Sequence, residues 1–391
     1  MSSEAPKKKI LHIIDGFGAG GAETWLLATV KYLKLHPELG IQFDFLATGG
    51  ERKIFDDEIT LHGSCIYYKK YSFKNGLKFR KFFIDLLQKN NYQAIHDHQD
   101  FISGWHFLLG AGYLPEIRIA HLHNPYNFVH NYVVNPGRWF SFKMGRILTA
   151  ILANRITGTS NAVMNEYGYG KWPFKSRRIN PAYCGFDISK FRYNEISRDS
   201  VRTELGWTNS DHKICLFVGR IGLHDYDTAL SQKNPEYAFS IARDLVSRNE
   251  HWRFIFVGFK GKLGSEMEKE TRTTGFADKI KFLGLRNDVE AIMSASDIFI
   301  FPSLWEGLGM VAVKAQASGL PVIMSDTISK EAVICPELVT VKKLGEGYRE
   351  WANTVLDLAE EKYDRPSYTY KVGMSSFSIE NSITNLVKLY S

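Results

Sequence analysis

The sequence predicts an α/β protein with two Rossmann-like, doubly wound domains that face a central cleft, and three observations lead to this fold class. Short apolar segments alternate with helical segments along nearly the whole chain, as in parallel sheets that are covered on both faces. The alternation falls into two series, separated by residues 178–194, which contain turn residues and show no helical period. The 391 residues are enough for two domains, each with its own core.

The first series contains six expected strands, and helical segments connect them, beginning with one over residues 22–35. The strands are expected at Lys9–Ile14, Ile41–Leu46, Cys65–Tyr67, Ala94–Asp97, Arg118–His121 and Arg155–Thr159. Alternation of this kind predicts a parallel sheet whose strands all end at one edge.

The turn after the first strand has two interpretations. Gly16, Gly18 and Gly21 stand in the GxGxxG spacing between a strand and a helix, and Asp44 lies near the end of the next strand. This is the fingerprint of dinucleotide-binding proteins. A glycine-rich first turn equally lets the phosphate or the sugar of another ligand approach the backbone.

The second series also contains six expected strands. They are Lys213–Val218, Arg253–Val257, Lys279–Leu283, Asp297–Phe301, Pro321–Met324 and Leu338–Val341. Ligands of doubly wound sheets bind at the carboxyl ends of the strands. The expected site therefore lies in the cleft between the two halves.

Residues 297–326 are the most informative stretch, because they read as strand, loop, helix and strand. The loop carries Glu306 and two glycines, Gly307 and Gly309, and a helix of small residues follows from Met310. Free backbone N–H groups and the positive end of the helix dipole suit this position to a phosphate or a sugar hydroxyl. An ordinary loop of an α/β sheet also uses glycine for its turn, and that alternative stays open.

Two cations accompany this loop. Arg220 follows the first strand of the second series, and Lys233 opens the next helix. A planar guanidinium and an ammonium at strand and helix ends could clamp a diphosphate, or both could be ordinary surface cations. Asp225 and Asp227 between them resemble a DxD metal–nucleotide motif, but their polar surroundings indicate a solvated insertion.

Histidines end two strands of the first series. His121 and His123 lie on the same side of one strand, with His123 at its carboxyl edge, where it could donate to a phosphate or to an oxygen that gains charge. A structural histidine is the competing interpretation. His96 and His98 form a similar HxH pair, for which a metal is conceivable but not expected.

Part of the net charge of +7 is concentrated in residues 69–83, where aromatic and leucine side chains stand between six basic ones. The ordinary explanation is an amphipathic helix whose apolar side packs in the core. The second is an anionic membrane surface, and nucleic acid is not expected as a partner.

The cysteines and the apolar segments limit the class of protein further. Four cysteines lie far apart without a CxxC pair, so neither a disulfide framework nor a zinc site is expected. No apolar stretch reaches the roughly 20 residues of a spanning helix. We expect a cytoplasmic protein, and peripheral attachment to the inner face of the cell membrane is a further hypothesis.

Taken together, these motifs resemble the retaining glycosyltransferases of family four, most closely those that build bacterial capsular polysaccharide or exopolysaccharide. The resemblance covers nearly the whole chain from Lys9 and is most specific between Gly219 and Asp326. It rests on GGAE, AHLHN, CGFDxxxF, VGR with KNP, FVG, FLGxRxDV, DIFIFPSLWEGLGMVAV and ASGLPVIMSD.

The resemblance implies the GT-B architecture of two Rossmann-like domains. Residues 1–185 would bind the acceptor and residues 186–375 the nucleotide-sugar donor. Residues 376–391 would form a helix, over Ser378–Tyr390, that crosses back to the first domain. The family needs no metal, because cations and helix dipoles neutralise the diphosphate.

The resemblance also assigns roles to single residues. Arg220 and Lys233 would bind the donor diphosphate, and Gly20 and Gly21 would let it approach the first domain. Main-chain groups of Gly307, Leu308, Gly309 and Met310 would bind the sugar and the phosphate.

Two further residues would act at the reacting centre. Glu306 matches the first carboxylate of the family's Glu-x7-Glu motif and would approach the transferred sugar. His123 would be the active-site histidine.

The second glutamate of that motif is replaced by Lys314. In the family this carboxylate accepts hydrogen bonds from the ribose, and lysine has no acceptor. The loss would cost on the order of 1–3 kcal/mol of donor binding. The lysine could reflect an altered donor contact, an introduced substitution or a copy that has lost activity.

The resemblance therefore implies a retaining hexosyltransferase that needs no metal or cofactor and moves a sugar, with UDP as the expected nucleotide, to a saccharide or lipid-linked saccharide in surface polysaccharide synthesis. One alternative is a catalytically weakened homologue that acts as a binding partner, suggested by Lys314. The other is a nicotinamide-dependent enzyme, suggested by the GxGxxG turn and Asp44.

Overall fold

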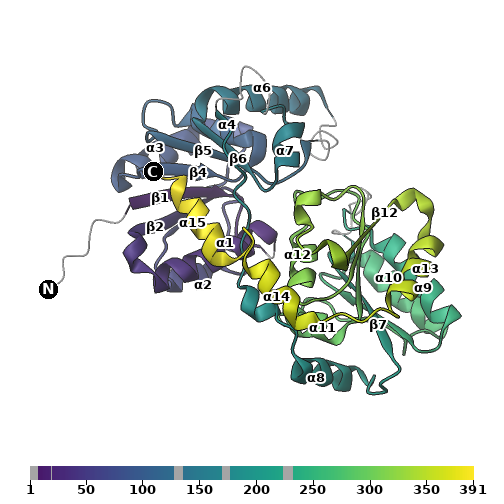
Figure 1. The fold of residues 1–391 in the computed structure, drawn as a ribbon. Helices are drawn as coiled ribbons and strands as arrows, with labels where there is room; N and C mark the ends of the chain where they lie inside the picture. Colours follow the sequence, from purple (N-terminus) through teal and green to yellow (C-terminus); the bar gives the residue numbers. More distant parts are fainter. Residues whose placement is uncertain (1–7, 19, 127–134, 170–176, 223–231) are drawn as a thin grey trace. The chain divides into compact units, whose positions relative to one another are not determined.

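The computed structural model describes residues 8–18, 20–126, 135–169, 177–222 and 232–391 (Figure 1). The chain divides into two compact units, Met1–Phe186 with Ile379–Ser391, and Asp187–Ser378. Each unit contains one six-stranded parallel sheet with helices around it (Figure 1). In the part of the chain that is described, no helix combines the length and the apolar character needed to cross a membrane.

The first sheet has the order β3-β2-β1-β4-β5-β6. Its strands are β1 (Lys8–Ile14), β2 (Ile41–Ala47), β3 (Ile66–Tyr68), β4 (Ala94–Asp97), β5 (Ile117–Leu122) and β6 (Arg155–Gly158). Among the described residues, the α-helices of this unit are α1 (Gly21–Leu35), α2 (Asp56–Leu61), α3 (Gly76–Asn90), α4 (Ser103–Leu109), α6 (Pro136–Leu152), α7 (Asn161–Glu166) and α15 (Ile379–Lys388).

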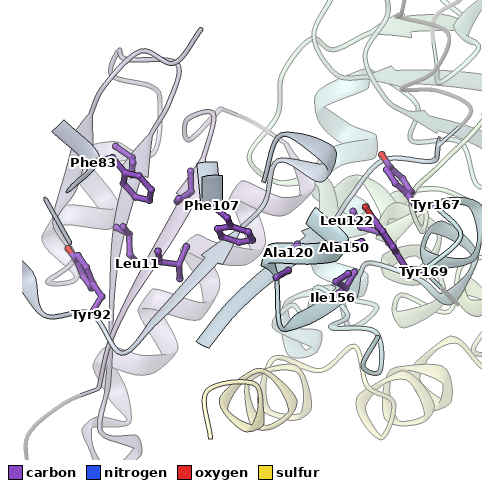
Figure 2. Close-up of a cluster of buried hydrophobic side chains, with 14 of the residues drawn as sticks. Leu11, Phe83, Tyr92, Phe107, Ala120, Leu122, Ala150, Ile156, Tyr167 and Tyr169 are labelled. Carbon is purple, nitrogen blue, oxygen red and sulfur yellow. The ribbon is translucent and has the colours of Figure 1, made fainter. Parts of the chain in front are cut away.

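Alternation along β1 gives the first sheet two different faces. Leu11 and Ile13 contribute to a hydrophobic core with side chains of α3, α4 and α6, part of which Figure 2 shows. His12, between them, is fully buried on the opposite face. One side of the sheet is therefore an ordinary apolar core, and the other contains imidazole.

The C-terminal helix α15 belongs to the first unit. It packs against α1, where Trp25 Nε1 donates to Ser382 Oγ over 3.1 Å. Ser382 Oγ in turn donates to the backbone oxygen of Tyr183 over 2.7 Å. These two bonds hold α15 against α1 and against the backbone near Tyr183, just before the chain leaves the first unit at Phe186.

The second sheet has the order β12-β11-β10-β7-β8-β9. Its strands are β7 (Lys213–Val218), β8 (Trp252–Val257), β9 (Ile280–Phe282), β10 (Ile298–Phe301), β11 (Val322–Ser325) and β12 (Val339–Lys342). Its helices are α8 (Glu195–Leu205), α9 (Pro235–Arg248), α10 (Lys262–Thr273), α11 (Val289–Ala295), α12 (Met310–Ala317), α13 (Tyr348–Leu358) and α14 (Arg365–Gly373).

All twelve predicted strands are present, each within one residue of its expected ends. The predicted fold class, two doubly wound parallel sheets, is confirmed. In both sheets the order reverses beside the first strand of the series, β1 or β7. This topological switch is the place where doubly wound sheets bind ligands.

Candidate functional site

Two loops of the second unit bring Lys233 and Glu306 together. The loops follow β7 and β10, which are neighbours in the sheet, and Leu304 N donates to Gln232 O over 2.8 Å. Lys233 Nζ lies 2.6 Å from Glu306 Oε1, and the two side chains are 20% and 8% exposed. A nearly buried carboxylate is thus neutralised by an ammonium at the carboxyl edge of the sheet.

Gln232 connects this pair to Arg220. Its Nε2 donates to Glu306 Oε2 over 3.3 Å and to Trp305 O over 3.1 Å. Its Oε1 accepts a long hydrogen bond of 3.5 Å from Arg220 Nη2. Gln232 was not among the predicted site residues, and its position directly before Lys233 was the only signal for it.

The absence of a side chain at Gly219 makes room for Lys233. A Cβ atom on Gly219 would lie 2.8 Å from Lys233 Cγ, so the stem of the lysine packs directly on the backbone that follows β7. The ammonium lies 4.9 Å from the centre of the Phe301 ring, a distance at which cation–π attraction operates. The glycine of the VGR motif therefore serves the packing of Lys233.

The loop after β10 ends in a conformation that requires glycine. Gly309 precedes α12 with φ of 98°, and a Cβ there would also lie 3.1 Å from Phe301 and Ile328. Leu308 is 3% exposed and anchors the loop in the core. The start of α12 at Met310, as predicted, leaves the backbone of Gly307–Met310 at a helix N-terminus.

Lys314 lies on α12, and its ammonium is 5.3 Å from the centre of the Phe191 ring. Phe191 ends the short 3-10 helix Ile188–Phe191, which packs against α12. The lysine that replaces the motif glutamate is thus placed over an aromatic ring of the same unit.

Gly20 and Gly21 lie in the first unit, at the N-terminus of α1. A Cβ atom on Gly20 would meet only the Glu23 carboxylate, the flexible end of a side chain, and the backbone there is extended with φ of −95°, so neither feature requires glycine. Asp44 is buried and accepts hydrogen bonds from Cys65 N over 3.1 Å and from Tyr92 Oη over 3.0 Å. Its two oxygens serve bonds within the unit, which weakens the dinucleotide interpretation of the GxGxxG turn.

His123 follows β5 and is half-buried. Its backbone N donates to Asp100 Oδ1 over 2.7 Å, and its Nε2 lies 2.9 Å from His98 Nδ1. Burial lowers the pKa of His123 to about 4, so the ring is neutral at pH 7. The same burial raises the pKa of Asp100 to about 6.

Histidines also form the only groups of metal-ligating side chains found among the described residues. In two sets of three the nearest ring nitrogens lie within 4.8 Å of one another. The sets are His12, His96 and His98, and His98, His121 and His123. Asp225 and Asp227, the other residues considered for a metal, lie outside the described residues.

The basic segment 69–83 packs as its ordinary explanation requires. Phe79 and Phe83 on α3 are fully buried in the hydrophobic core of the first unit, and Figure 2 labels Phe83. Phe73 and Leu77 are 59% and 83% exposed, among exposed lysine and arginine side chains. The segment therefore combines a core-facing side with a small basic and apolar surface.

Two family models match the chain. Glycosyltransferase Family 4 matches residues 19–190, and Glycosyl transferases group 1 matches residues 212–361. The putative glycosyltransferase EpsF of Bacillus subtilis (strain 168) is 28% identical over 362 residues, which cover 89% of this chain and 87% of EpsF. The capsular polysaccharide biosynthesis glycosyltransferase CapH of Staphylococcus aureus is 27% identical over 360 residues, 90% of this chain and 91% of CapH.

A solved structure shares the fold over nearly the whole length. Anabaena HepE in complex with UDP aligns with a TM-score of 0.75 over 97% of this chain and 98% of HepE, at 16% identity. At this identity the likeness concerns the fold, and it supports the two-domain arrangement of sheets described above.

Proposed function

The chain belongs to the family 4 glycosyltransferases, and we propose that it transfers a sugar from a UDP-linked donor to a saccharide or lipid-linked saccharide acceptor in polysaccharide biosynthesis. The single observation that carries the proposal is the arrangement of Arg220, Lys233 and Glu306 around Gln232. Both family models describe glycosyltransferases, and the relative CapH is a glycosyltransferase of capsular polysaccharide biosynthesis, which supports the general class of activity. UDP is proposed because HepE, with the same fold, was crystallised with it.

The ion pair suggests how the second unit handles the donor. A diphosphate is a stronger partner for Lys233 than one carboxylate, because it carries more charge and more acceptor oxygens. When the diphosphate takes Lys233, Glu306 becomes available to accept hydrogen bonds from sugar hydroxyls. Arg220 would complete the cationic clamp, and the backbone of Gly307–Met310 would contribute donors at the start of α12.

We further propose that the transfer retains the anomeric configuration and needs no metal. Two side-chain cations would neutralise the leaving diphosphate, which is the task that a divalent ion performs in other enzymes. His123, a neutral imidazole at the end of β5, would donate a hydrogen bond in the acceptor unit. The proposal includes no cofactor, since the nucleotide-sugar is a substrate.

The test is a transfer assay with several UDP-sugars, in which the anomer formed is identified by NMR. Activity should persist in EDTA and the product should keep the donor's anomeric configuration. Activity that disappears in EDTA and returns with magnesium or manganese would refute the metal-independent mechanism, and an inverted product would refute retention.

A membrane contact is a separate part of the proposal. Exposed Phe73 and Leu77 lie among exposed Lys74, Lys78 and Lys81. Such a surface would bind anionic lipid weakly and bring the acceptor unit to a lipid-linked substrate. We therefore propose a peripheral enzyme at the cytoplasmic face of the membrane.

A further inference from the structure

The face of the first sheet opposite the apolar core carries a linked set of side chains, which we call the histidine chain. It consists of five histidines from β1, β4, β5 and the residues that follow them, together with one tyrosine from the C-terminus. Its members are His12, His96, His98, His121, His123 and Tyr390.

One half of the chain runs from His121 to the tyrosine. His121 Nδ1 lies 3.0 Å from His96 Nε2, and His96 Nδ1 lies 2.8 Å from Tyr390 Oη. The tyrosine is fully buried and reaches the sheet just after α15.

The other half runs from the tyrosine to the strand end. Tyr390 Oη lies 3.3 Å from His12 Nε2, and His12 Nδ1 lies 2.9 Å from His98 Nε2. His98 Nδ1 then lies 2.9 Å from His123 Nε2. Six groups are therefore joined in one unbranched sequence that ends at His123.

Every ring has the same orientation in the histidine chain. In the four rings before His123, Nδ1 bonds to the next group on the way to His123, and in each ring after His121, Nε2 bonds to the group before it. A neutral imidazole has one N–H and one acceptor nitrogen, and burial keeps these rings neutral at pH 7. Each hydrogen bond between two rings needs one proton. The tautomer of one ring therefore sets the tautomer of the next ring. When the Tyr390 hydroxyl accepts from one ring and donates to the other, the chain has two fully bonded states, all Nδ1–H or all Nε2–H. A third state, in which the hydroxyl accepts from both His96 and His12, would leave the buried Tyr390 O–H without an acceptor.

The end of the chain decides between the two states. Among the described residues, His121 Nε2 is buried and has no hydrogen-bond partner. In the Nε2–H state it would be a buried N–H without an acceptor, which is rare in folded proteins and costs more than an unused lone pair. In the Nδ1–H state, His121 Nε2 has only an unused lone pair, so this state is the more stable of the two.

We propose that Tyr390 and the four histidines behind His123 are positioning residues that hold His123 as its Nδ1–H tautomer. In that state His98 occupies Nε2 of His123, so the ring can donate from Nδ1 but has no free nitrogen to accept a proton. The role of this donor in sugar transfer rests on the proposed function. The tautomer itself does not.

Zinc is the competing occupant of these histidines. Two nitrogens on one tetrahedral zinc ion, each at 2.0–2.1 Å, lie about 3.4 Å apart. The linked nitrogens of the rings lie at 2.9 to 3.0 Å and already share protons. Zinc would therefore have to break the chain.

The experiment is long-range ¹H–¹⁵N correlation NMR of the full chain labelled in its 12 histidines, with His→Gln variants to assign the signals. We expect all five rings to show the Nδ1–H pattern at pH 7. A mixture of tautomers, or a uniform Nε2–H pattern, would overturn the proposal. So would one equivalent of zinc that binds and removes the Nδ1–H signals.

Tyr390→Phe removes the hydroxyl that joins the two halves. We expect His96 and His121 to populate both tautomers, because His96 Nδ1–H loses its acceptor, whereas His12, His98 and His123 keep the Nδ1–H pattern, since His12 Nε2–H would be buried without an acceptor. Tyr92→Phe is the matched control, because it removes a buried hydroxyl that bonds to Asp44 and not to the chain. Unchanged tautomers in Tyr390→Phe would contradict the proposal, whereas loss of nucleotide binding with an intact Nδ1–H pattern would count only against the proposed function.

Discussion

Lys233 and Glu306 form an ion pair of 2.6 Å although 73 residues separate them in the sequence. The pair exists because β7 and β10 are neighbours, so the loops that follow these strands meet at one edge. In a donor site this pair has a specific meaning. The cation that should bind the diphosphate is occupied by the carboxylate that should bind the sugar, and the substrate must exchange one partner for the other.

Glu306→Gln tests this exchange. The amide no longer competes for Lys233, so we expect UDP to bind at least as tightly as to the parent chain. Turnover should fall by about a hundredfold or more, since the carboxylate no longer accepts strong hydrogen bonds from the sugar. Calorimetry and a transfer assay measure the two effects. Glu270→Gln, which removes a half-exposed carboxylate paired with Arg243, should change neither, and a large loss of UDP affinity in Glu306→Gln would refute the exchange.

Lys314→Glu restores the carboxylate that the family motif has at this position. We expect UDP to bind about ten- to a hundredfold more tightly, because a pair of hydrogen bonds to the ribose is regained. Lys314→Met separates this effect from the loss of a cation, since methionine removes the charge without adding an acceptor. Equal affinity in the two variants would show that the ribose contact is not made here.

The histidine chain predicts a steep loss of stability in acid. Burial lowers the pKa of His12 to about 3 and of His123 to about 4, and lowers those of the other three well below 6.5. Below pH 6.5 the unfolded chain therefore binds more protons than the folded one, and each histidine costs up to about 1.4 kcal/mol per pH unit.

Asp100 affects stability in the opposite direction. Burial raises its pKa to about 6, so it favours the folded state as the pH falls, but it is a single group and the five histidines outweigh it. The hydroxyl of Tyr390 stays neutral in this range because burial raises its pKa. We expect the melting temperature to fall steeply from pH 7 to pH 5 in scanning calorimetry. A constant melting temperature over that interval would show that the imidazoles are not held neutral.

The membrane surface is tested by charge reversal of Lys74, Lys78 and Lys81 together. Binding to vesicles that contain anionic phospholipid should fall at least tenfold, since each basic side chain contributes about 1 kcal/mol at such a surface. The same reversal at Lys262, Lys269 and Lys362, which are exposed in the second unit, changes the net charge equally. If both variants lose the same affinity for the vesicles, net charge alone explains the binding, and residues 69–83 are not the contact surface.

The strands were predictable, and so were the positions of Arg220, Lys233 and Glu306 near strand or helix ends, because each depends on local pattern. Buried parallel strands are continuous apolar runs, and Arg220, Lys233 and Glu306 each stand where such a run or the following helix has an end. The fingerprint around Gly16 was misleading in one respect. Asp44 has the right spacing, yet it bonds to Cys65 N and Tyr92, which sequence spacing does not reveal.

The histidine chain could not be predicted from local sequence pattern. His96 with His98 and His121 with His123 were visible as pairs, but joining them to His12 requires the strand order β1-β4-β5. Tyr390 lies 294 residues from its partner His96. Contacts of that sequence separation depend on where α15 packs, and nothing near either residue signals the partner.

The central claim, that the second unit binds a nucleoside diphosphate through Lys233, is tested most directly by calorimetric titration of UDP, GDP and ADP into the parent chain and Lys233→Met. Lys371→Met, which removes a surface lysine paired with Glu337, is the control. We predict that UDP binds most tightly of the three and that Lys233→Met weakens it at least tenfold, while Lys371→Met has no effect. If no nucleotide binds, or if Lys233→Met binds UDP as tightly as the parent chain, this donor site is wrong.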